Sequence, residues 1–378
     1  MKNILITGGA GFIGSNLALK LIDKGYNIRL LDNLSPQIHG YNPKFTSPLY
    51  QSIMGKVDFI QGDVTVMKDW LEAINGQDVL IHLAAETGTG QSMYEIKRDV
   101  DVNIGGTAVM LDILTNAKHS VQKIIVASSR AIYGEGKYEC NVHGIVYPDS
   151  RNEHDMQKGD FECKCPICNR EVSHLPTDEN SKINPTSIYG ITKQNQEQMV
   201  LTIGKTLGIP SIAFRYQNVY GPGQSLSNPY TGILSIFSTI INNNHTINIF
   251  EDGKESRDFV FVDDAVNATI LGIENKTDKY GAYNVGLGSE TSVKNVVDTL
   301  QKYLHKKIEY KITGNFRLGD IRSNFADISK ISNELGYKPT VSFEDGIKRF
   351  LDWVAIQNVE VDNYSDSIKE MKMRGLYK

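Results

Sequence analysis

The chain has 378 residues, of which 40% are hydrophobic and 22% are charged, and its formal net charge is −4. A chain of this length can bury a substantial core and is expected to form two domains. The near-balanced charge gives no reason to expect nucleic acid or an anionic membrane as a partner, and no apolar run approaches the length of a membrane span. A strand is expected directly after Lys2, with no signal peptide before it, which predicts a cytoplasmic location.

The N-terminal segment has the pattern of a strand, a glycine-rich turn and a helix. The apolar run 3–7 is followed by three spaced glycines, and a helical pattern of apolar residues begins at Ile13. Gly8 permits the tight turn, Gly11 lets backbone amides approach a pyrophosphate, and Gly14 lets the helix pack closely on the strand. The anion would lie at the N-terminus of the helix, where free N–H groups and the macrodipole stabilise it. This array predicts a dinucleotide fold.

A second strand is predicted for residues 27–31, and it ends at Asp32. A carboxylate at this position accepts hydrogen bonds from the adenosine ribose and would repel a 2′-phosphate, so the predicted cofactor is NAD rather than NADP. Asp63 follows a strand predicted for residues 57–60 and is expected to contact the adenine. The residues expected to bind NAD are Gly8, Gly11, Phe12, Ile13, Gly14, Asp32, Asn33, Asp63, Val64, Leu83, Ala84, Ala85, Tyr189 and Lys193.

Strands and helices continue to alternate along the chain. The predicted strands are residues 79–83, 123–127 and 211–214, and amphipathic segments lie near residues 98–118 and 187–207. Parallel strands that are covered on both faces have continuous apolar runs, as these do. The pattern predicts an α/β fold with a Rossmann-type doubly wound parallel sheet in residues 1–215. A smaller mixed α/β substrate domain, mainly residues 216–378, is expected to close over the strand ends.

Tyr189 and Lys193 are four residues apart, so on a helix they project from the same face. A cation beside a phenol favours the phenolate, so a group with an ordinary pKa of about 10 can act as a base near neutrality. Ser129 lies at the predicted C-terminal end of a strand, where it can hydrogen-bond the substrate oxygen whose proton Tyr189 removes.

With these motifs, the chain resembles the extended short-chain dehydrogenase/reductase family, the NAD-dependent nucleotide-sugar epimerases and dehydratases. The resemblance covers nearly the whole chain and implies that Ser129, Tyr189 and Lys193 are catalytic, with Ser128 a secondary contact.

The two residues after the catalytic serine bear on the reaction type. The 4,6-dehydratases of the family carry an Asp-Glu pair there, whereas this chain has Arg130 and Ala131. Neither side chain can shuttle a proton at neutral pH, so dehydration and the related decarboxylation are not expected. The reaction type that remains is reversible hydride transfer at one carbon. This type includes epimerisation through a ketone and a simple alcohol/ketone oxidoreduction.

The resemblance also implies a nucleotide diphosphate sugar as the substrate. Stretches 85–92, 128–133 and 217–232 are similar to those of the dTDP-L-rhamnose 4-epimerase group. Arg257 and Arg317 match diphosphate clamps, for which a planar guanidinium is suited. Phe250 matches a position that packs on the base, with a core residue as the equal alternative. The expected substrate contacts are Glu86, Thr87, Gln91, Ser92, Ser129, Asn218, Phe250, Arg257 and Arg317.

A Cys-rich insert, residues 135–184, separates the catalytic serine from the tyrosine and contains all four cysteines. Two segments have the pattern of zinc knuckles, each a pair of ligands around a tight turn followed by a residue that tolerates a positive φ. Free thiols and disulfides are the alternatives, and a cytoplasmic setting disfavours disulfides. Cys163 could replace the histidine as fourth ligand. The ligands predicted for a structural, non-catalytic zinc ion are Cys140, His143, Cys165 and Cys168.

The predicted activity is 4-epimerisation through a transient 4-keto sugar, on a dTDP-6-deoxyhexose such as dTDP-L-rhamnose. One alternative is a nucleotide-sugar 4-ketoreductase or dehydrogenase with the same catalytic residues. Another is a non-catalytic NAD-binding scaffold, which would need no general base. A homodimer is expected, with a nucleotide diphosphate sugar as the small-molecule partner.

Overall fold

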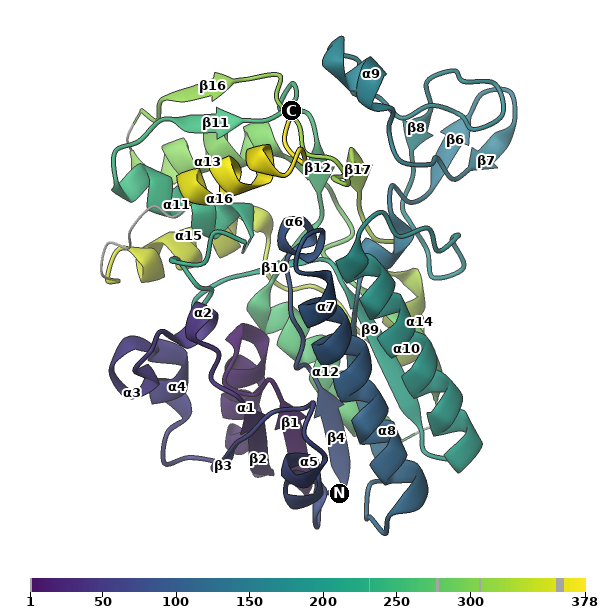
Figure 1. Cartoon of the computed structure of the whole chain (residues 1–378), viewed down its shortest axis with the longest axis vertical. Helices are drawn as coiled ribbons and strands as arrows, with labels where there is room; N and C mark the ends of the chain where they lie inside the picture. The colour runs from purple at the N-terminus through teal and green to yellow at the C-terminus, as the bar shows by residue number, and fades with distance from the viewer. Residues whose placement is uncertain (1, 231, 277–278, 306, 358–363) are drawn as a thin grey trace.

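A seven-stranded parallel sheet forms the lower half of the molecule in Figure 1. The computed structural model describes residues 2–230, 232–276, 279–305, 307–357 and 364–378. In spatial order the strands of the sheet are β14 (Tyr280–Val285), β9 (Ser211–Tyr216), β5 (Lys123–Ser129), β4 (Val79–His82), β1 (Asn3–Thr7), β2 (Asn27–Asp32) and β3 (Asp58–Gln61). All neighbouring strands are parallel, which confirms the predicted Rossmann-type fold.

Helices cover both faces of this sheet because successive strand residues point to opposite sides. In β1, Ile4 and Ile6 pack in one hydrophobic cluster and Leu5 packs in the other. The first cluster includes side chains of α1 (Phe12–Asp23) and α12 (Val262–Glu274). The second includes side chains of α5 (Met67–Ile74), α8 (Gly106–Asn116) and α10 (Ile188–Leu207). Full burial on both faces is what the continuous apolar runs of the strands require.

The predicted helix near residues 98–118 is interrupted. The chain forms α7 (Ile96–Asp99), then a π-helical turn, η1 (Val100–Gly105), and then continues as α8. Asn103 in this turn accepts a hydrogen bond from the backbone N–H of Glu86 and donates one to its carbonyl oxygen. The turn therefore fixes the backbone that leaves β4.

A second layer lies above the carboxyl ends of the strands, at the upper left of Figure 1. Its helices are α11 (Ile233–Asn242), α13 (Val293–Leu304), α15 (Phe343–Val354) and α16 (Tyr364–Met373). Its short strand groups are β10 (Asn218–Tyr220) with β13 (Phe259–Phe261), β11 (Ile247–Ile249) with β16 (Tyr310–Ile312), and β15 (Thr291–Ser292) with β12 (Ser256–Arg257) and β17 (Ser323–Asn324).

The division expected at residue 216 does not follow the layers, since α12 and β14 return to the large sheet. The strand β14 was not among the predicted ones. The hydrophobic cluster under α1 and α12 also continues into α13 and α15, so the two layers share a core. The separation into two domains stays a prediction.

The insert projects at the upper right of Figure 1. It contains β6 (Tyr138–Cys140), β7 (Gly144–Val146), α9 (Glu153–Gln157) and β8 (Ser173–His174). Its two ends meet, because the N–H of Leu175 donates to the carbonyl of Lys137 at 2.8 Å. The N–H of Asn184 likewise donates to the carbonyl of Ile132 at 2.9 Å. The insert therefore closes on itself and leaves the order of the large sheet unchanged.

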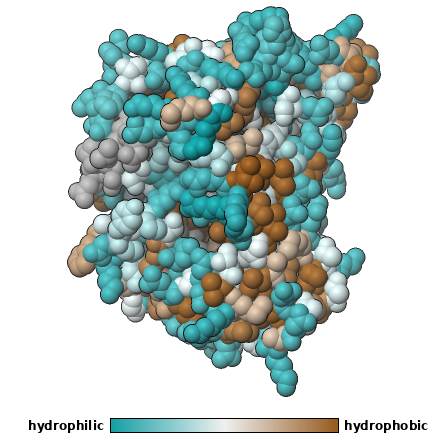
Figure 2. All heavy atoms as spheres, in the orientation of Figure 1, coloured by the Kyte–Doolittle hydropathy of each residue, from teal (hydrophilic) through white to brown (hydrophobic). Residues whose placement is uncertain are grey.

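The remaining short helices connect these parts. They are α2 (Pro36–His39), α3 (Pro43–Thr46), α4 (Pro48–Ile53), α6 (Thr89–Ser92), the 3-10 turn η2 (Arg130–Tyr133) and α14 (Ser329–Leu335). Figure 2 shows a mixed surface on this face, with hydrophilic side chains over much of the upper layer and hydrophobic ones gathered near the middle. Among the described residues, no helix combines the length and apolarity needed to cross a membrane.

Candidate active site

A cavity opens at the carboxyl ends of β1, β2, β4, β5 and β9, where ligands bind in sheets of this type. Its lining joins residues from the glycine turn, from the end of β5 and from α10. The predicted site residues that line it are Gly8, Gly11, Phe12, Ile13, Gly14, Asp32, Asn33, Val64, Leu83, Ala84, Ala85, Glu86, Thr87, Ser129, Tyr189, Lys193 and Asn218.

The glycine turn is tightly packed. Gly8 has a φ of +65°, and a Cβ there would lie 2.7 Å from the backbone nitrogen of Ala84. A Cβ on Gly14 would lie 2.4 Å from the carbonyl oxygen of Gly8, so the helix can approach the strand only without a side chain. Gly11 is the N-cap of α1 and offers no side-chain hydrogen bond to the first turn. Backbone N–H groups of that turn are therefore available to an anionic ligand.

Asp32 is buried at the end of β2, and its carboxylate supports the turn. It accepts hydrogen bonds from the N–H groups of Ala10, at 3.0 Å, and Leu34, at 2.8 Å. Burial raises the pKa of Asp32, while these bonds and the nearby His39 act in the opposite direction. His39 also lines the cavity, although no sequence motif singled it out.

Asp63 does not line this cavity, although Gly62 and Val64 on either side of it do. Its carboxylate accepts hydrogen bonds from the side chain of Asn33 and from the N–H and hydroxyl of Thr65. The carboxylate is thus held by its own loop, and the predicted adenine contact stays a prediction.

Ser129, Tyr189 and Lys193 meet at the end of β5. The Lys193 ammonium donates to the carbonyl of Ala127 at 2.9 Å, which ties α10 to the strand. Ser187 caps α10 by accepting a hydrogen bond from the N–H of Gly190 at 3.1 Å, so Tyr189 lies in the first turn. The predicted Tyr-x-x-x-Lys pair therefore faces the serine across the cavity.

Several charges act on Tyr189. Burial raises the pKa of Tyr189, and a hydrogen bond with Ser129 and the positive charge of Arg130 oppose that rise, while Asp99 adds to it. Burial lowers the pKa of Lys193 itself to about 7, against the opposing effect of Asp99. Arg130 therefore favours the phenolate of Tyr189, and the same role predicted for Lys193 stays a prediction.

The second serine has a different partner. The Ser128 hydroxyl donates to the Glu197 carboxylate at 2.6 Å, and Glu197 is in turn paired with Arg215. This buried group supports the end of β5, so the Ser128 hydroxyl is already engaged within the protein.

The predicted sugar contacts after β4 divide into two groups. Glu86 and Thr87 line the cavity, and Glu86 forms an ion pair with Arg98 at 2.8 Å. Gln91 and Ser92 are buried behind it: Gln91 bonds to Gln37, which does line the cavity, and the Ser92 hydroxyl accepts a hydrogen bond from the N–H of Tyr189 at 3.1 Å. They support the lining rather than form it.

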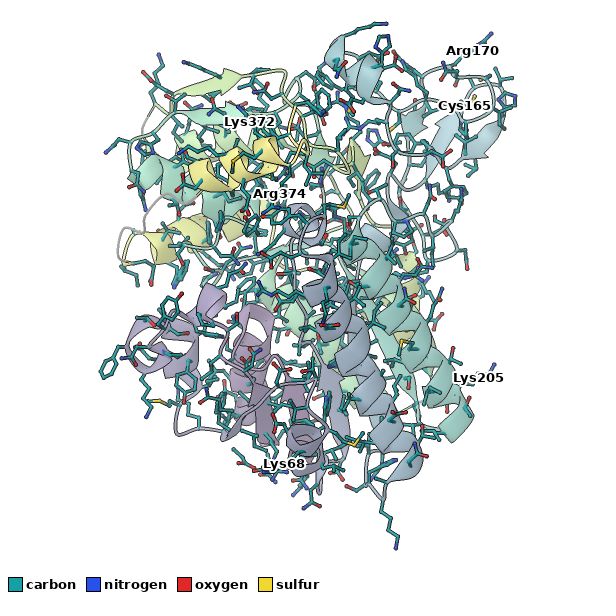
Figure 3. All side chains as sticks on the ribbon, viewed as in Figure 1. Lys68, Cys165, Arg170, Lys205, Lys372 and Arg374 are labelled. Carbon is teal, nitrogen blue, oxygen red and sulfur yellow. The ribbon has the colours of Figure 1, made fainter. Side chains whose placement is uncertain are left out.

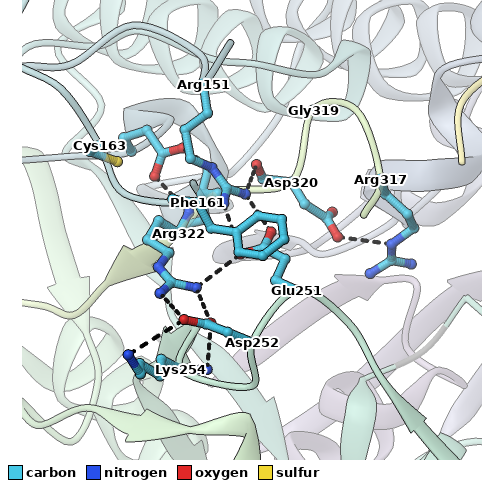
Figure 4. A network of polar contacts seen from close by, with 12 residues as sticks. Arg151, Phe161, Cys163, Glu251, Asp252, Lys254, Arg317, Gly319, Asp320 and Arg322 are labelled. Carbon is cyan, nitrogen blue, oxygen red and sulfur yellow. Dashed lines mark hydrogen bonds and ion pairs between the residues drawn. The ribbon is translucent and has the colours of Figure 1, made fainter. Parts of the chain in front are cut away.

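Arg257 and Arg317 do not reach the lining. The Arg257 guanidinium donates to the carbonyls of Ser256, Ile321 and Arg322. Arg317 pairs with Asp320 at 2.8 Å, as Figure 4 shows.

Phe250 is also outside the lining, and it is covered by other side chains. Arg317 lies over its ring at 5.3 Å, and Tyr377 makes an edge contact at 5.2 Å. Sequence matching could not reveal that a segment more than 120 positions away occupies this place. The roles predicted for Phe250, Arg257 and Arg317 stay predictions.

In the insert, the four predicted metal ligands come together. The ligand atoms of Cys140, His143, Cys165 and Cys168 all lie within 4.8 Å of one another. As predicted, each knuckle ends in a residue with a positive φ, Gly144 at +67° and Asn169 at +57°. Figure 3 places Cys165 in the insert, at the upper right.

Cys163 lies outside this group. Its thiol donates to the hydroxyl of Tyr138 at 3.4 Å, and burial raises its pKa well above the ordinary value. The geometry thus favours His143 over Cys163 as the fourth member of the set.

Comparison with known proteins gives consistent matches. Residues 4–159 match the NAD dependent epimerase/dehydratase family, and residues 171–350 match the family described as GDP-mannose 4,6 dehydratase. The chain is 35% identical to a dTDP-L-rhamnose 4-epimerase of Burkholderia thailandensis, over 94% of this chain and 95% of that protein. It is 33% identical to a putative UDP-glucose 4-epimerase of Methanocaldococcus jannaschii, over 94% and 99% of the two chains.

Solved structures are also similar to this chain over nearly its whole length. A UDP-glucuronic acid 4-epimerase from Bacillus cereus, in complex with UDP-glucuronic acid and NAD, matches with a TM-score of 0.75 and 26% identity, over 93% of this chain and 99% of that one. A UDP-glucose 4-epimerase from Thermotoga maritima, with UDP-glucose, matches with a TM-score of 0.74 and 29% identity, over 93% and 98%.

Proposed function

The chain belongs to the NAD-dependent epimerase/dehydratase family, and from this we propose that it is a nucleotide-sugar 4-epimerase whose substrate is a dTDP-6-deoxyhexose such as dTDP-L-rhamnose. The observation that carries the proposal is the position of Ser129, Tyr189 and Lys193 at one end of the cavity that begins at the glycine turn. A general base is needed for chemistry and not for binding, which argues against a scaffold role.

The residues of the cavity fit NAD. The uncapped first turn of α1 suits a pyrophosphate, and Gly8 and Gly14 allow the close backbone contacts that hold this turn at the end of the strand. Asp32 lies where a ribose hydroxyl would meet a carboxylate. NAD held by these residues would supply a reversible hydride acceptor for C4, so that the reaction would have no net oxidation.

The protein side of the reaction is acid/base chemistry. The Tyr189 phenolate takes the proton of the C4 hydroxyl, and the Ser129 hydroxyl hydrogen-bonds the same oxygen. Loss of this proton and of the C4 hydride leaves a ketone. Return of both to the opposite face of the rotated sugar inverts C4. Arg130 and Ala131 offer no carboxylate for water loss, which favours epimerisation over dehydration.

The test is turnover of a panel of nucleotide sugars without added NAD, with separation of the epimers. Conversion of dTDP-L-rhamnose to its C4 epimer, with no NADH accumulating, is the expected result. Product limited to about one equivalent of the bound NAD, with an equal amount of NADH formed, would instead support a dehydrogenase, or a ketoreductase running in reverse. No turnover with any sugar of the panel would contradict the proposal.

We also propose that Cys140, His143, Cys165 and Cys168 hold one structural zinc ion. Three thiols and one imidazole within 4.8 Å form a donor set that suits tetrahedral zinc, with no position left for a substrate. The hydrophobic cluster of the insert is small and consists largely of cysteines, so metal binding would supply folding energy that its core lacks.

Elemental analysis of protein purified without chelator tests this site. About one zinc ion per chain is expected, with loss in Cys140→Ser, Cys165→Ser and His143→Ala and retention in Cys163→Ser, the matched control outside the set. Absence of stoichiometric metal from the unaltered protein, or loss of metal in Cys163→Ser, would contradict the assignment.

A further inference from the structure

Arg130 lines the cavity without a carboxylate partner. Several other arginines in the described parts of the chain form ion pairs, such as Arg151 with Glu251 at 2.7 Å and Arg322 with Asp252 at 2.7 Å. Arg98, which also lines the cavity, pairs with carboxylates on two sides. Within the described residues, Arg130 makes no ion pair, and its side-chain hydrogen bond joins Nε to Asn218 Oδ1 at 3.2 Å.

The terminal nitrogens of Arg130 therefore retain N–H groups that no described residue accepts. A guanidinium presents five donors, and a desolvated cation with unused donors is unfavourable unless a ligand completes it. Because the side chain lines the cavity, the ligand that enters this cavity is the available acceptor.

The surroundings increase this need for an acceptor. Burial and the nearby charge of Arg257 lower the pKa of Arg130 to about 9, against the opposing effects of Asp320, Tyr189 and Glu135. The guanidinium remains a cation at neutral pH. Neither Asp320 nor Glu135 is within ion-pair distance, since Asp320 pairs with Arg317 and Glu135 with Arg151.

The position of Arg130 puts this charge at the reacting end of the substrate. Arg130 directly follows Ser129, and its charge acts on the phenol of Tyr189. When the proton of the C4 hydroxyl moves to the phenolate and the hydride leaves C4, negative charge passes from the tyrosine oxygen to the substrate oxygen. A cation that lines the same cavity as Ser129 and Tyr189 and is held by Asn218 can stabilise that charge without rearrangement during the reaction.

We propose that Arg130 is a further catalytic residue, which stabilises the phenolate of Tyr189 and the negative charge that develops on the C4 oxygen of the sugar. The part of this inference that concerns the sugar oxygen rests on the proposed function. The part that concerns the Tyr189 phenolate rests on the structure alone. It gives a role to the residue that stands where a dehydratase would need a carboxylate.

The first test measures Tyr189 directly, without turnover. The phenolate absorbance of Tyr189 in the NAD-loaded protein is isolated by subtracting the titration of Tyr189→Phe, and the same is done in an Arg130→Met background. Removal of the guanidinium should raise the apparent pKa of Tyr189. Ser129 and Asp99, which also act on the phenol, are unchanged in the comparison, and so is Lys193. Identical titrations would overturn the proposal, even if no sugar substrate had been found.

The second test uses kinetics. Arg130→Met should lower kcat by about 10²-fold, as loss of one donor to a developing oxyanion does, and should move the acidic limb of kcat/KM to higher pH. Arg130→Lys should restore part of kcat. Binding of dTDP alone should change less than about twofold, which on an affinity scale is well under 1 kcal/mol.

The outcomes separate three explanations. A loss of dTDP affinity as large as the loss of kcat/KM would mean that Arg130 binds the diphosphate, and would overturn the catalytic role. An unaltered protein that turns over no nucleotide sugar would refute the proposed function and leave the tyrosine titration as the deciding test. Thermal unfolding and NAD content of each variant show whether the fold is kept.

Discussion

At the residue scale, Tyr189 is held from three sides before any substrate binds. Its N–H donates to Ser92, its phenol bonds to Ser129, and the helix that carries it is capped by Ser187. A base in such a fixed position loses little freedom when it reacts, and this lowers the cost of reaching the transition state.

Tyr189→Phe should reduce turnover by at least about 10²-fold, because the ring keeps its packing while the transferable proton is lost. The affinity for the nucleotide sugar should persist, and calorimetric titration of the variant measures it. Turnover within twofold of the unaltered protein would remove Tyr189 as the base.

The placement of the proposed catalytic residues could be predicted in part from local spacing. Tyr189 and Lys193 share a helix face, and Ser129 ends a strand, so these placements follow from short-range sequence. The charge environment could not be predicted in this way. The effect of Arg130 on Tyr189 depends on burial and on the contact that Arg130 makes with Asn218 of β10.

At the element scale, an arginine–carboxylate network fastens the insert to the upper layer. Arg151 of the insert makes two bonds to the Glu251 carboxylate, at 2.7 and 2.8 Å, and Arg322 bonds to Glu251, Asp252 and Glu162 (Figure 4). The side chains of Arg151, Glu251 and Arg322 are each 4% exposed or less. Each of these three carboxylates has a guanidinium partner.

Glu251→Gln should destabilise the protein by about 3–5 kcal/mol, because it leaves two buried guanidinium groups short of charge. Denaturant unfolding, with zinc content checked, measures the change. Lys294→Met, which breaks the exposed pair of Lys294 with Asp298 on α13, is the control and should change stability by less than about 1 kcal/mol. Similar values for the two variants would show that the network contributes no more than a surface pair.

Strands of the large sheet were predictable where both faces are covered by apolar side chains. The strand β14 was missed because Tyr280–Val285 mixes Gly, Asn and Tyr with its apolar residues, and its polar side chains find partners only in the fold. Asn284, for example, is fully buried and bonds to Tyr133 and to the carbonyl of Thr177. The π-helical turn η1 was also missed, since helical periodicity does not reveal one extra residue.

At the scale of the whole molecule, the C-terminal helix α16 contacts the cavity from the far end of the sequence. The Glu370 carboxylate accepts hydrogen bonds from the hydroxyls of Tyr94 and Tyr230, both at 3.2 Å, and Tyr230 lines the cavity. Arg374, which directly follows this helix and is labelled in Figure 3, lies over the Tyr94 ring at 4.4 Å. The helix thus positions part of the lining.

Glu370→Ala should raise KM for the nucleotide sugar several-fold and change kcat less, because Tyr230 loses its anchor while the catalytic residues are untouched. Lys369→Ala, on the exposed side of the same helix, is the matched control and should leave both constants unchanged. Steady-state kinetics of the two variants measure KM and kcat. An equal fall of kcat in Glu370→Ala with KM unchanged would contradict a positioning role.

The closure of the insert has a consequence for the history of the gene. Since Lys137 and Leu175 are joined by one hydrogen bond, the DNA that encodes the residues between them could be gained or lost as a single cassette, while the seven strands keep their order. A synthetic gene that replaces residues 138–174 with a short glycine-containing turn should therefore still encode the parallel sheet. A parallel transplant of the cassette into another protein would ask whether the proposed zinc site can be moved as one heritable unit.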